Sequence, residues 1–207
     1  MNAPTARAAA RLSRSDRRAQ LLGVAKLVFV AQGYHATGMD EIAERAGVSK
    51  PVLYQHFPSK LELYLALLAD SAAEMVRLVR VALTGTEDND ERVHRAVQAY
   101  FTYVADSSET YRLIFESDLR ATPEVAAIVD RATQDCIDAI TATITTDTGV
   151  DPQRAQLLAS GLVGLSQVSA RYWISSPGTL NRDEAVELLS TLAWRGISRF
   201  PRHPGIG

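Results

Sequence analysis

The sequence has little of what membrane, secreted and metal-binding proteins require. Its 207 residues include a single cysteine, Cys136, so no disulfide can form within the chain, and a reducing cytoplasm suits it. No apolar run approaches the roughly 20 residues needed to cross a bilayer. The first residues, MNAPTARAAARLSR, are rich in Arg and Ala but contain no apolar segment of the kind that a secretory signal needs. These absences favour a cytoplasmic protein that binds no membrane.

Catalytic and metal-binding patterns are also absent. The four histidines (His35, His56, His94 and His203) are scattered along the chain, and no Ser/His/Asp, Cys/His or metal-ligand spacing includes them. We therefore expect no catalytic residue, no bound metal and no cofactor, and we predict that the protein is not an enzyme.

Apolar residues recur at helical spacing along most of the chain, and no strand pattern competes with them. We predict an all-α fold in which a three-helix N-terminal domain precedes a C-terminal bundle of six helices. The domains are a flexible basic arm (1–14), a helix-turn-helix domain (15–60) and a ligand-binding and dimerisation domain (61–207). The longer helices are predicted at about 15–32, 61–83, 91–106, 109–118, 123–146, 152–174 and 183–198.

The segment between residues 37 and 62 carries closely spaced helix signals. Thr37 predicts the start of one short helix, and Gly47 supplies the left-handed residue that ends it. Ser49 predicts the cap of a second helix, whose first turn accommodates Pro51. The segment 59–62, SKLE, reads as a capping box that opens a third helix. Two short helices joined by AGVS indicate a helix-turn-helix.

Charge is distributed unevenly. Residues 1–60 hold 9 Lys and Arg against 4 Asp and Glu, whereas residues 61–207 hold 13 against 20. A basic N-terminal part on an acidic body is typical of a DNA-contacting domain joined to a module with another role. The alternative is that these helices are ordinary parts of an all-α enzyme or scaffold.

The same segment carries motifs of a known family. GYHAT, IAERAGVS, LYQHF and SK, within residues 15–75, closely resemble the N-terminal domain of TetR/AcrR transcriptional regulators. Gly38 departs from the pattern, since the family usually has Thr or Ser there. VQAYFTYV, YRLIFESDL, PEVAAIV and GLVGLSQVSARYWI resemble the actinobacterial branch that regulates fatty-acid synthesis.

This resemblance implies a homodimer, double-stranded DNA with an inverted-repeat operator, and a hydrophobic effector, which for this branch is long-chain acyl-CoA. Repression is the family default, whereas the fatty-acid branch implies activation. Two rival functions stay open. One is a TetR-type repressor of an efflux or catabolic operon with another apolar ligand, and the other is a helical lipid carrier or enzyme that binds no DNA.

The second short helix is the predicted reader of DNA. Lys50 and Lys60 would neutralise phosphates, and Gln55 would pair with an adenine edge. The family match implies that Tyr54 and His56 bind phosphate oxygens. The predicted DNA-binding set is Thr37, Gly38, Met39, Ser49, Lys50, Pro51, Val52, Tyr54, Gln55, His56 and Lys60. An arginine-rich arm (Arg7, Arg11, Arg14, Arg17 and Arg18) either enters a minor groove or is a solvated tail.

Residues 155–174 are apolar almost all round but include Ser160, Gly161, Gly164, Ser166, Ser169 and Ala170. Small residues allow two helices to approach closely, so this segment predicts a dimer seam. Its bulky partners would be Leu188, Leu189, Leu192 and Trp194, in a four-helix interface. The alternative is a helix buried within its own chain.

The regulatory role that the resemblance implies predicts that the middle helices enclose the effector, although such apolar residues in a helical bundle are more often plain core. The predicted lining is Met75, Leu78, Val79, Tyr100, Phe101, Val104, Tyr111, Phe115, Ile128, Ile140, Leu165 and Tyr172. Cations for the phosphates of an acyl-CoA would come from Arg77, Arg80, Arg92, Arg112, Arg120 and Arg171. The helix over 61–83 joins both domains and is the predicted lever, and Phe115→Ala should weaken the ligand response without changing DNA affinity.

Overall fold

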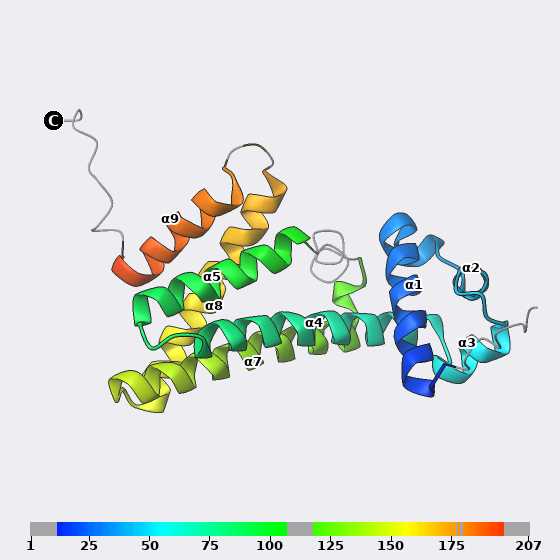
Figure 1. The fold of residues 1–207 in the computed structure, drawn as a ribbon, viewed down its shortest axis with the longest axis horizontal. Coiled ribbons are helices and arrows are strands. Elements are labelled where there is room, and N and C mark those ends of the chain that lie inside the picture. The colour runs from blue at the N-terminus through cyan, green and yellow to red at the C-terminus, as the bar shows by residue number, and fades with distance from the viewer. Residues whose placement is uncertain (1–11, 107–117, 177, 179, 197–207) are drawn as a thin grey trace, which may run out of the picture. The chain divides into compact units, whose positions relative to one another are not determined.

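The computed structural model describes residues 12–106, 118–176, 178 and 180–196. These residues form eight α-helices, one 3-10 helix and no strand (Figure 1), which confirms the all-α prediction for the described part of the chain. The elements are α1 (Arg14–Ala36), α2 (Met39–Arg45), α3 (Lys50–His56), α4 (Lys60–Thr84), α5 (Asn89–Asp106), η1 (Asp118–Ala121), α7 (Pro123–Thr148), α8 (Pro152–Ser175) and α9 (Arg182–Arg195). Within the described ranges, no helix is long and apolar enough to cross a membrane.

Helix ends follow the local signals in the sequence. Pro123 and Pro152 lie in the first turns of α7 and α8, and Gly149 ends α7 with a φ of 69°. The last helix was predicted to reach residue 198, but α9 ends at Arg195 because Gly196 takes a φ of 70°. The helix predicted over 109–118 lies outside the described residues, except for Asp118 in η1.

The chain divides into two compact units, Met1–Leu67 and Leu68–Gly207. The division falls inside α4, a few residues beyond the boundary expected at residue 60. In the first unit α1 packs on α2 and α2 on α3. Its core contains fully buried side chains from each of these helices and from the start of α4, among them Phe29, Ile42, Leu53, Phe57 and Tyr64.

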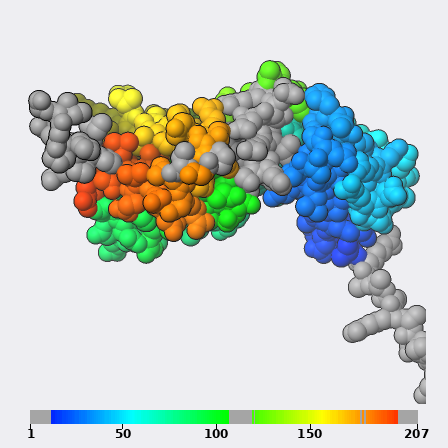
Figure 2. Space-filling view, turned by 90° about the horizontal axis from the view of Figure 1, so that it is seen from above, coloured from blue at the N-terminus to red at the C-terminus, as the bar shows by residue number. Residues whose placement is uncertain are grey.

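In the second unit α7 packs on α8 and α5 packs on α9, with further contacts of α8 to α5 and α9. Figure 2 shows α9, in orange, at the surface of this unit beside α8 in yellow. A buried apolar cluster runs through these helices and the second half of α4, and Met75, Phe101, Val104 and Cys136 belong to it.

Candidate nucleic-acid interface and ligand cavity

The turn between α2 and α3 is a complete helix-ending motif. The Val48 amide donates to the carbonyl of Ala43 and the Gly47 amide to that of Glu44, both at 3.0 Å. Gly47 takes a φ of 65°, which lies in the left-handed region that residues with a Cβ rarely adopt. This pair of bonds satisfies the last carbonyls of α2 and turns the chain into α3, so the predicted helix-turn-helix is confirmed.

The face of α3 that is free to meet a ligand consists of Lys50, Pro51, Tyr54 and Gln55, all exposed. The opposite face is anchored by Leu53, which is fully buried. Val52 and His56 are half-buried beside it, and Ser49 precedes them as the exposed N-cap residue, without a side-chain cap bond. Gln55 is exposed and its amide makes no hydrogen bond with another described residue, so it is available to a partner. That this partner is a base edge stays a prediction.

The two lysines of the predicted set have different surroundings. Lys50 is exposed and its ammonium lies 2.6 Å from the Asp40 carboxylate, an exposed pair that a phosphate can replace. The Lys60 ammonium instead donates to three backbone carbonyls, those of Tyr34 at 2.9 Å, His35 at 3.3 Å and Thr37 at 2.9 Å. The prediction that Lys60 is a free phosphate contact is therefore wrong in this structure, since its charge caps the end of α1.

The residues at the start of α2 also need correction. Thr37 is 2% exposed and its hydroxyl donates to the Gly33 carbonyl at 2.7 Å, so it does not cap α2 as predicted. The N-cap position is Gly38, which has no side chain to make a cap bond. Met39 is 8% exposed. The side chains of Thr37 and Met39 thus face the core, whereas Gly38 between them is exposed.

Positive charge gathers around the end of α3. The guanidinium of Arg18 lies 4.4 Å from the centre of the Phe57 ring and donates to the His56 carbonyl at 3.3 Å. Burial lowers the pKa of the His56 imidazole, and the charges of Arg14, Arg18 and Arg17 lower it further. Burial and these arginines thus favour the neutral form of the imidazole, and the arginines provide a positive field that would attract an anion. Arg7 and Arg11 of the predicted arm lie outside the described residues.

The second unit contains a cavity of about 690 Å³ between α4, α5, α7, α8 and α9. Most of its lining is apolar, as in Val79, Leu83, Ile140, Ile144 and Leu162. Cys136 also lines it, and burial raises the pKa of this thiol to about 11. The volume and lining match those of small-molecule sites in general.

The predicted lining agrees only in part with this cavity. Val79, Tyr100, Ile140 and Leu165 line it. By contrast Met75, Leu78, Phe101, Val104 and Ile128 belong to the neighbouring packed core. Tyr172 is 71% exposed on α8 and takes no part. Tyr111 and Phe115 lie outside the described residues.

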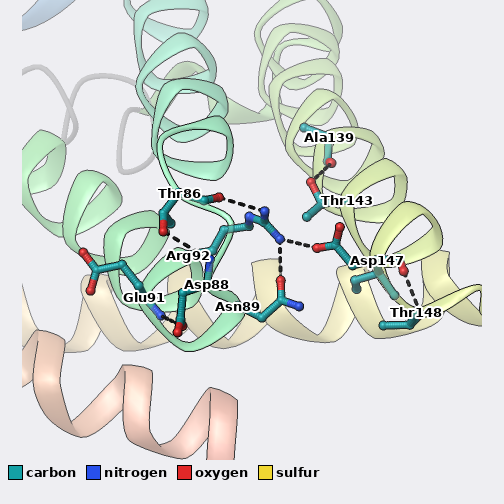
Figure 3. Close-up of polar contacts among 10 residues, drawn as sticks. Thr86, Asp88, Asn89, Glu91, Arg92, Ala139, Thr143, Asp147 and Thr148 are labelled. Atoms are coloured by element: carbon teal, nitrogen blue, oxygen red, sulfur yellow. Dashed lines mark hydrogen bonds and ion pairs between the residues drawn. The ribbon is translucent and has the colours of Figure 1, made fainter.

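One end of the cavity is polar. Figure 3 shows the Arg92 guanidinium between the α4–α5 connection and α7. One of its terminal nitrogens donates to both the Asp147 carboxylate and the Asn89 side chain, and the other donates to the Thr86 carbonyl at 2.8 Å. Among the described residues that line the cavity, Arg92 and Asp147 are the only charged ones.

The other arginines predicted at the cavity mouth are placed elsewhere. Arg77 pairs with Glu74 on the same helix, and the Arg80 guanidinium lies 3.9 Å from the Asp135 carboxylate, away from the cavity. Arg171 is exposed on α8. Arg112 and the side chain of Arg120 lie outside the described residues. Arg92 differs from the other predicted arginines because it pairs with Asp147 beside the cavity. Asp147 lies far from Arg92 in the sequence.

One face of α8 is apolar and exposed, and its Leu157 and Gly161 also border the cavity. Leu157, Val168 and Tyr172 are 75%, 59% and 71% exposed. Between them lie Gly161 and Gly164, where an added Cβ would meet no described atom within 4 Å. Glycine in a helix costs about 1 kcal/mol relative to alanine, and packing within the described chain does not account for it.

Of the bulky residues predicted for the seam on α9, Leu188 and Trp194 are exposed. Leu189 is buried, and Leu192 packs against the core of its own chain, so the prediction was wrong for these two. On α8, Ala170 is likewise fully buried. The uncovered faces of both helices nevertheless form a surface that a second copy could cover.

Comparison with known proteins agrees with this arrangement. Residues 21–67 match the model of bacterial regulatory proteins of the tetR family, and residues 89–196 match that of the tetracyclin repressor-like C-terminal domain. The HTH-type transcriptional activator FasR of Mycolicibacterium smegmatis is 52% identical over 92% of this chain and 87% of its own length.

Solved structures show the same fold. A TetR-like transcriptional regulator from Rhodococcus sp. RHA1 is 29% identical, covers 92% of this chain and 100% of its own, and has a TM-score of 0.69. The fatty acid degradation regulator FadR of Bacillus halodurans is 17% identical over 90% of this chain and 98% of its own, with a TM-score of 0.73, a likeness of fold alone. The first two relatives are named as transcriptional regulators, and FadR is named as a regulator of fatty acid degradation. With both units matched and a helix-turn-helix in the first, this chain belongs to the TetR family of bacterial transcriptional regulators.

Proposed function

We propose that this regulator controls fatty-acid synthesis genes and that long-chain acyl-CoA is the effector that sets its affinity for DNA. The observation that carries this proposal is the largely apolar cavity of about 690 Å³ in the unit that does not contain the helix-turn-helix. A cavity of this size holds a ligand with a long hydrocarbon chain. The 52% identity with an activator supports activation over repression.

The DNA partner is an operator with inverted-repeat symmetry. The exposed faces of α8 and α9 would join two copies about a two-fold axis. The two α3 helices would then meet successive major grooves, about 34 Å apart or a multiple of it. In each half-site Gln55 would read a base, while Lys50, Tyr54 and His56 would bind phosphates.

The energy available from a long acyl chain is sufficient for switching. Changing the ratio of two conformations from 1:99 to 99:1 requires about 5.5 kcal/mol of differential affinity. Each buried methylene contributes about 0.8 kcal/mol, so about seven methylenes that fit only one conformation supply this difference. The ligand can act on α4 because Val79 and Leu83 of this helix line the cavity, and α4 begins at Lys60 in the other unit.

The test is an electrophoretic mobility shift with DNA from upstream of the fatty-acid synthase genes, to which acyl-CoAs of increasing length are added. Specific binding that only long chains change would support the proposal. Binding to this DNA without any response to acyl-CoA would contradict the effector, and no binding to it would contradict the target genes. A regulator of an efflux or catabolic operon would then be the remaining function.

A further inference from the structure

The polar end of the cavity has a hydrogen-bond donor that the described chain leaves without an acceptor. The Nε of Arg92 is buried and has no partner among the described residues, although both terminal nitrogens of the same guanidinium are bonded. A buried N–H without an acceptor is costly. Arg92 lines the cavity, so a small shift of its side chain on ligand binding would let a ligand oxygen accept this hydrogen bond.

The charge at this end is already balanced. Asp147 pairs with Arg92, and the two side chains are 24% and 12% exposed. A ligand carboxylate would lie beside the Asp147 carboxylate without a cation of its own, which is unfavourable in a partly buried site. A carbonyl oxygen accepts the same hydrogen bond and carries no net charge.

From these two observations, and resting on the acyl effector proposed above, we propose that Arg92 and Asp147 form the headgroup site of the effector. Arg92 donates to the carbonyl oxygen of an uncharged acyl group such as a thioester, and Asp147 excludes free carboxylates. Asn89 holds the guanidinium in place from the start of α5. The site thereby distinguishes activated acyl groups from free fatty acids of the same length.

The experiment compares two probes that share one hydrocarbon chain, S-palmitoyl-N-acetylcysteamine, which is an uncharged thioester without phosphates, and palmitate. Their affinities for the full-length protein are measured by displacement of an uncharged reporter, a fluorescent fatty-acid methyl ester, whose own affinity is measured for each variant. The wild-type protein should bind the thioester at least about tenfold more tightly, the factor that corresponds to about 1.4 kcal/mol. Asp147→Asn should strengthen palmitate binding by about tenfold and leave thioester binding nearly unchanged, because Arg92 then has a free charge.

Two further variants make the test specific. Arg92→Lys keeps a positive charge beside Asp147 but removes the Nε donor, so thioester binding should weaken by about tenfold. Asp135→Asn is the matched control, since Asp135 is also on α7 and faces Arg80, but it does not line this cavity. It should change neither affinity. Thermal unfolding of each variant shows whether it is folded, and the wild-type comparison of the two probes requires no variant.

Equal binding of thioester and palmitate by the wild-type protein would overturn this inference, and so would an Asp147→Asn variant that still binds palmitate weakly. Both results leave the acyl effector standing, because the thioester still binds. Failure of the wild-type protein to bind either probe would instead contradict the acyl effector itself, and the headgroup site with it.

Discussion

Replacing Lys60 by methionine separates a structural from a DNA-binding role for this residue. Methionine keeps an apolar stem of similar length but removes the ammonium, which donates to the carbonyls of Tyr34, His35 and Thr37. The ammonium also lies 4.5 Å from the centre of the Tyr34 ring. These carbonyls follow the left-handed Gly33, where the chain leaves the regular part of α1 and carbonyls lack helical partners.

The expected loss of stability can be estimated from these contacts. A hydrogen bond to a charged group contributes about 1.5–3 kcal/mol, and a cation over an aromatic ring about 0.5–1 kcal/mol when exposed. The three hydrogen bonds share one ammonium, which is only half-buried, so their contributions do not add in full. We expect Lys60→Met to lower the free energy of unfolding by about 3 kcal/mol.

Urea unfolding followed by circular dichroism measures this loss, and DNA affinity as a function of salt measures phosphate contacts. Lys60→Met should lower the urea midpoint and leave the salt dependence of DNA binding unchanged at temperatures where the variant is folded. Lys50→Met removes an exposed ammonium 2.6 Å from Asp40, and it should affect the salt dependence of DNA binding rather than the urea midpoint. It should change stability by less than about 0.5 kcal/mol and reduce the salt slope by about 0.9. An unchanged urea midpoint together with a reduced slope for Lys60→Met would refute the structural assignment.

Three further predictions concern the turn, the α8 face and the imidazole. Gly47→Ala should destabilise the protein by about 1–2 kcal/mol, measured by urea unfolding. The cause would be the backbone conformation alone, since an added Cβ meets no described atom within 4 Å. An unchanged urea midpoint would contradict this. Val168→Glu, at a position 59% exposed on α8, should give a monomer by light scattering, whereas Val81→Glu, 57% exposed on α4, should stay dimeric; a dimeric Val168→Glu would exclude this face. The lowered pKa of His56 favours the neutral imidazole in the free protein, whereas a bound phosphate favours its protonation. DNA affinity should therefore rise as the pH is lowered from 8 to 6, and it should rise more in the wild-type protein than in His56→Gln. Equal pH profiles of the two proteins would argue against a phosphate at His56.

Most of the fold was predictable because its helix ends are encoded locally. Pro152 begins α8, and Gly149 ends α7, through backbone preferences that depend on no distant contact. The end of α9 was misplaced although it had a local signal as well. Gly196 lies within the predicted last helix, and its left-handed φ of 70° shows that the glycine should have been given more weight than the apolar spacing around it.

The errors in the DNA-binding set come from side chains that have two possible partners. The Thr37 hydroxyl can cap the next helix or bond back to the fourth residue before it, and the structure has the second bond, to Gly33. Lys60 can meet a phosphate or a helix end, and the carbonyls around residues 34–37 bind it first. No sequence pattern decides such a competition, since the outcome depends on how closely α4 approaches the end of α1.

The cavity was harder to predict than the DNA-reading helix because apolar spacing is the same for a packed core and for a cavity wall. Phe101 and Ile140 look equivalent in the sequence, yet Phe101 packs in the core and Ile140 lines the cavity. Exposed surface is predicted equally poorly, since Tyr172 continues an apolar helix and is nevertheless 71% exposed. Which side of a helix lines the cavity depends on how all five helices around the cavity pack together.

The polar residues of the cavity in the second unit were also hard to predict from the sequence. Arg92 was one of six arginines that the sequence could not distinguish, and its partner Asp147 is 55 positions away. Their meeting inside an apolar cavity changes the chemistry expected of the site. A lone arginine would attract any anion, including a free fatty acid, whereas an arginine neutralised by a carboxylate and left with an unbonded Nε–H favours an uncharged acceptor. If the headgroup site is correct, selectivity for activated acyl groups therefore depends on Asp147, a residue that repels the wrong ligand, as much as on the arginine that binds the right one.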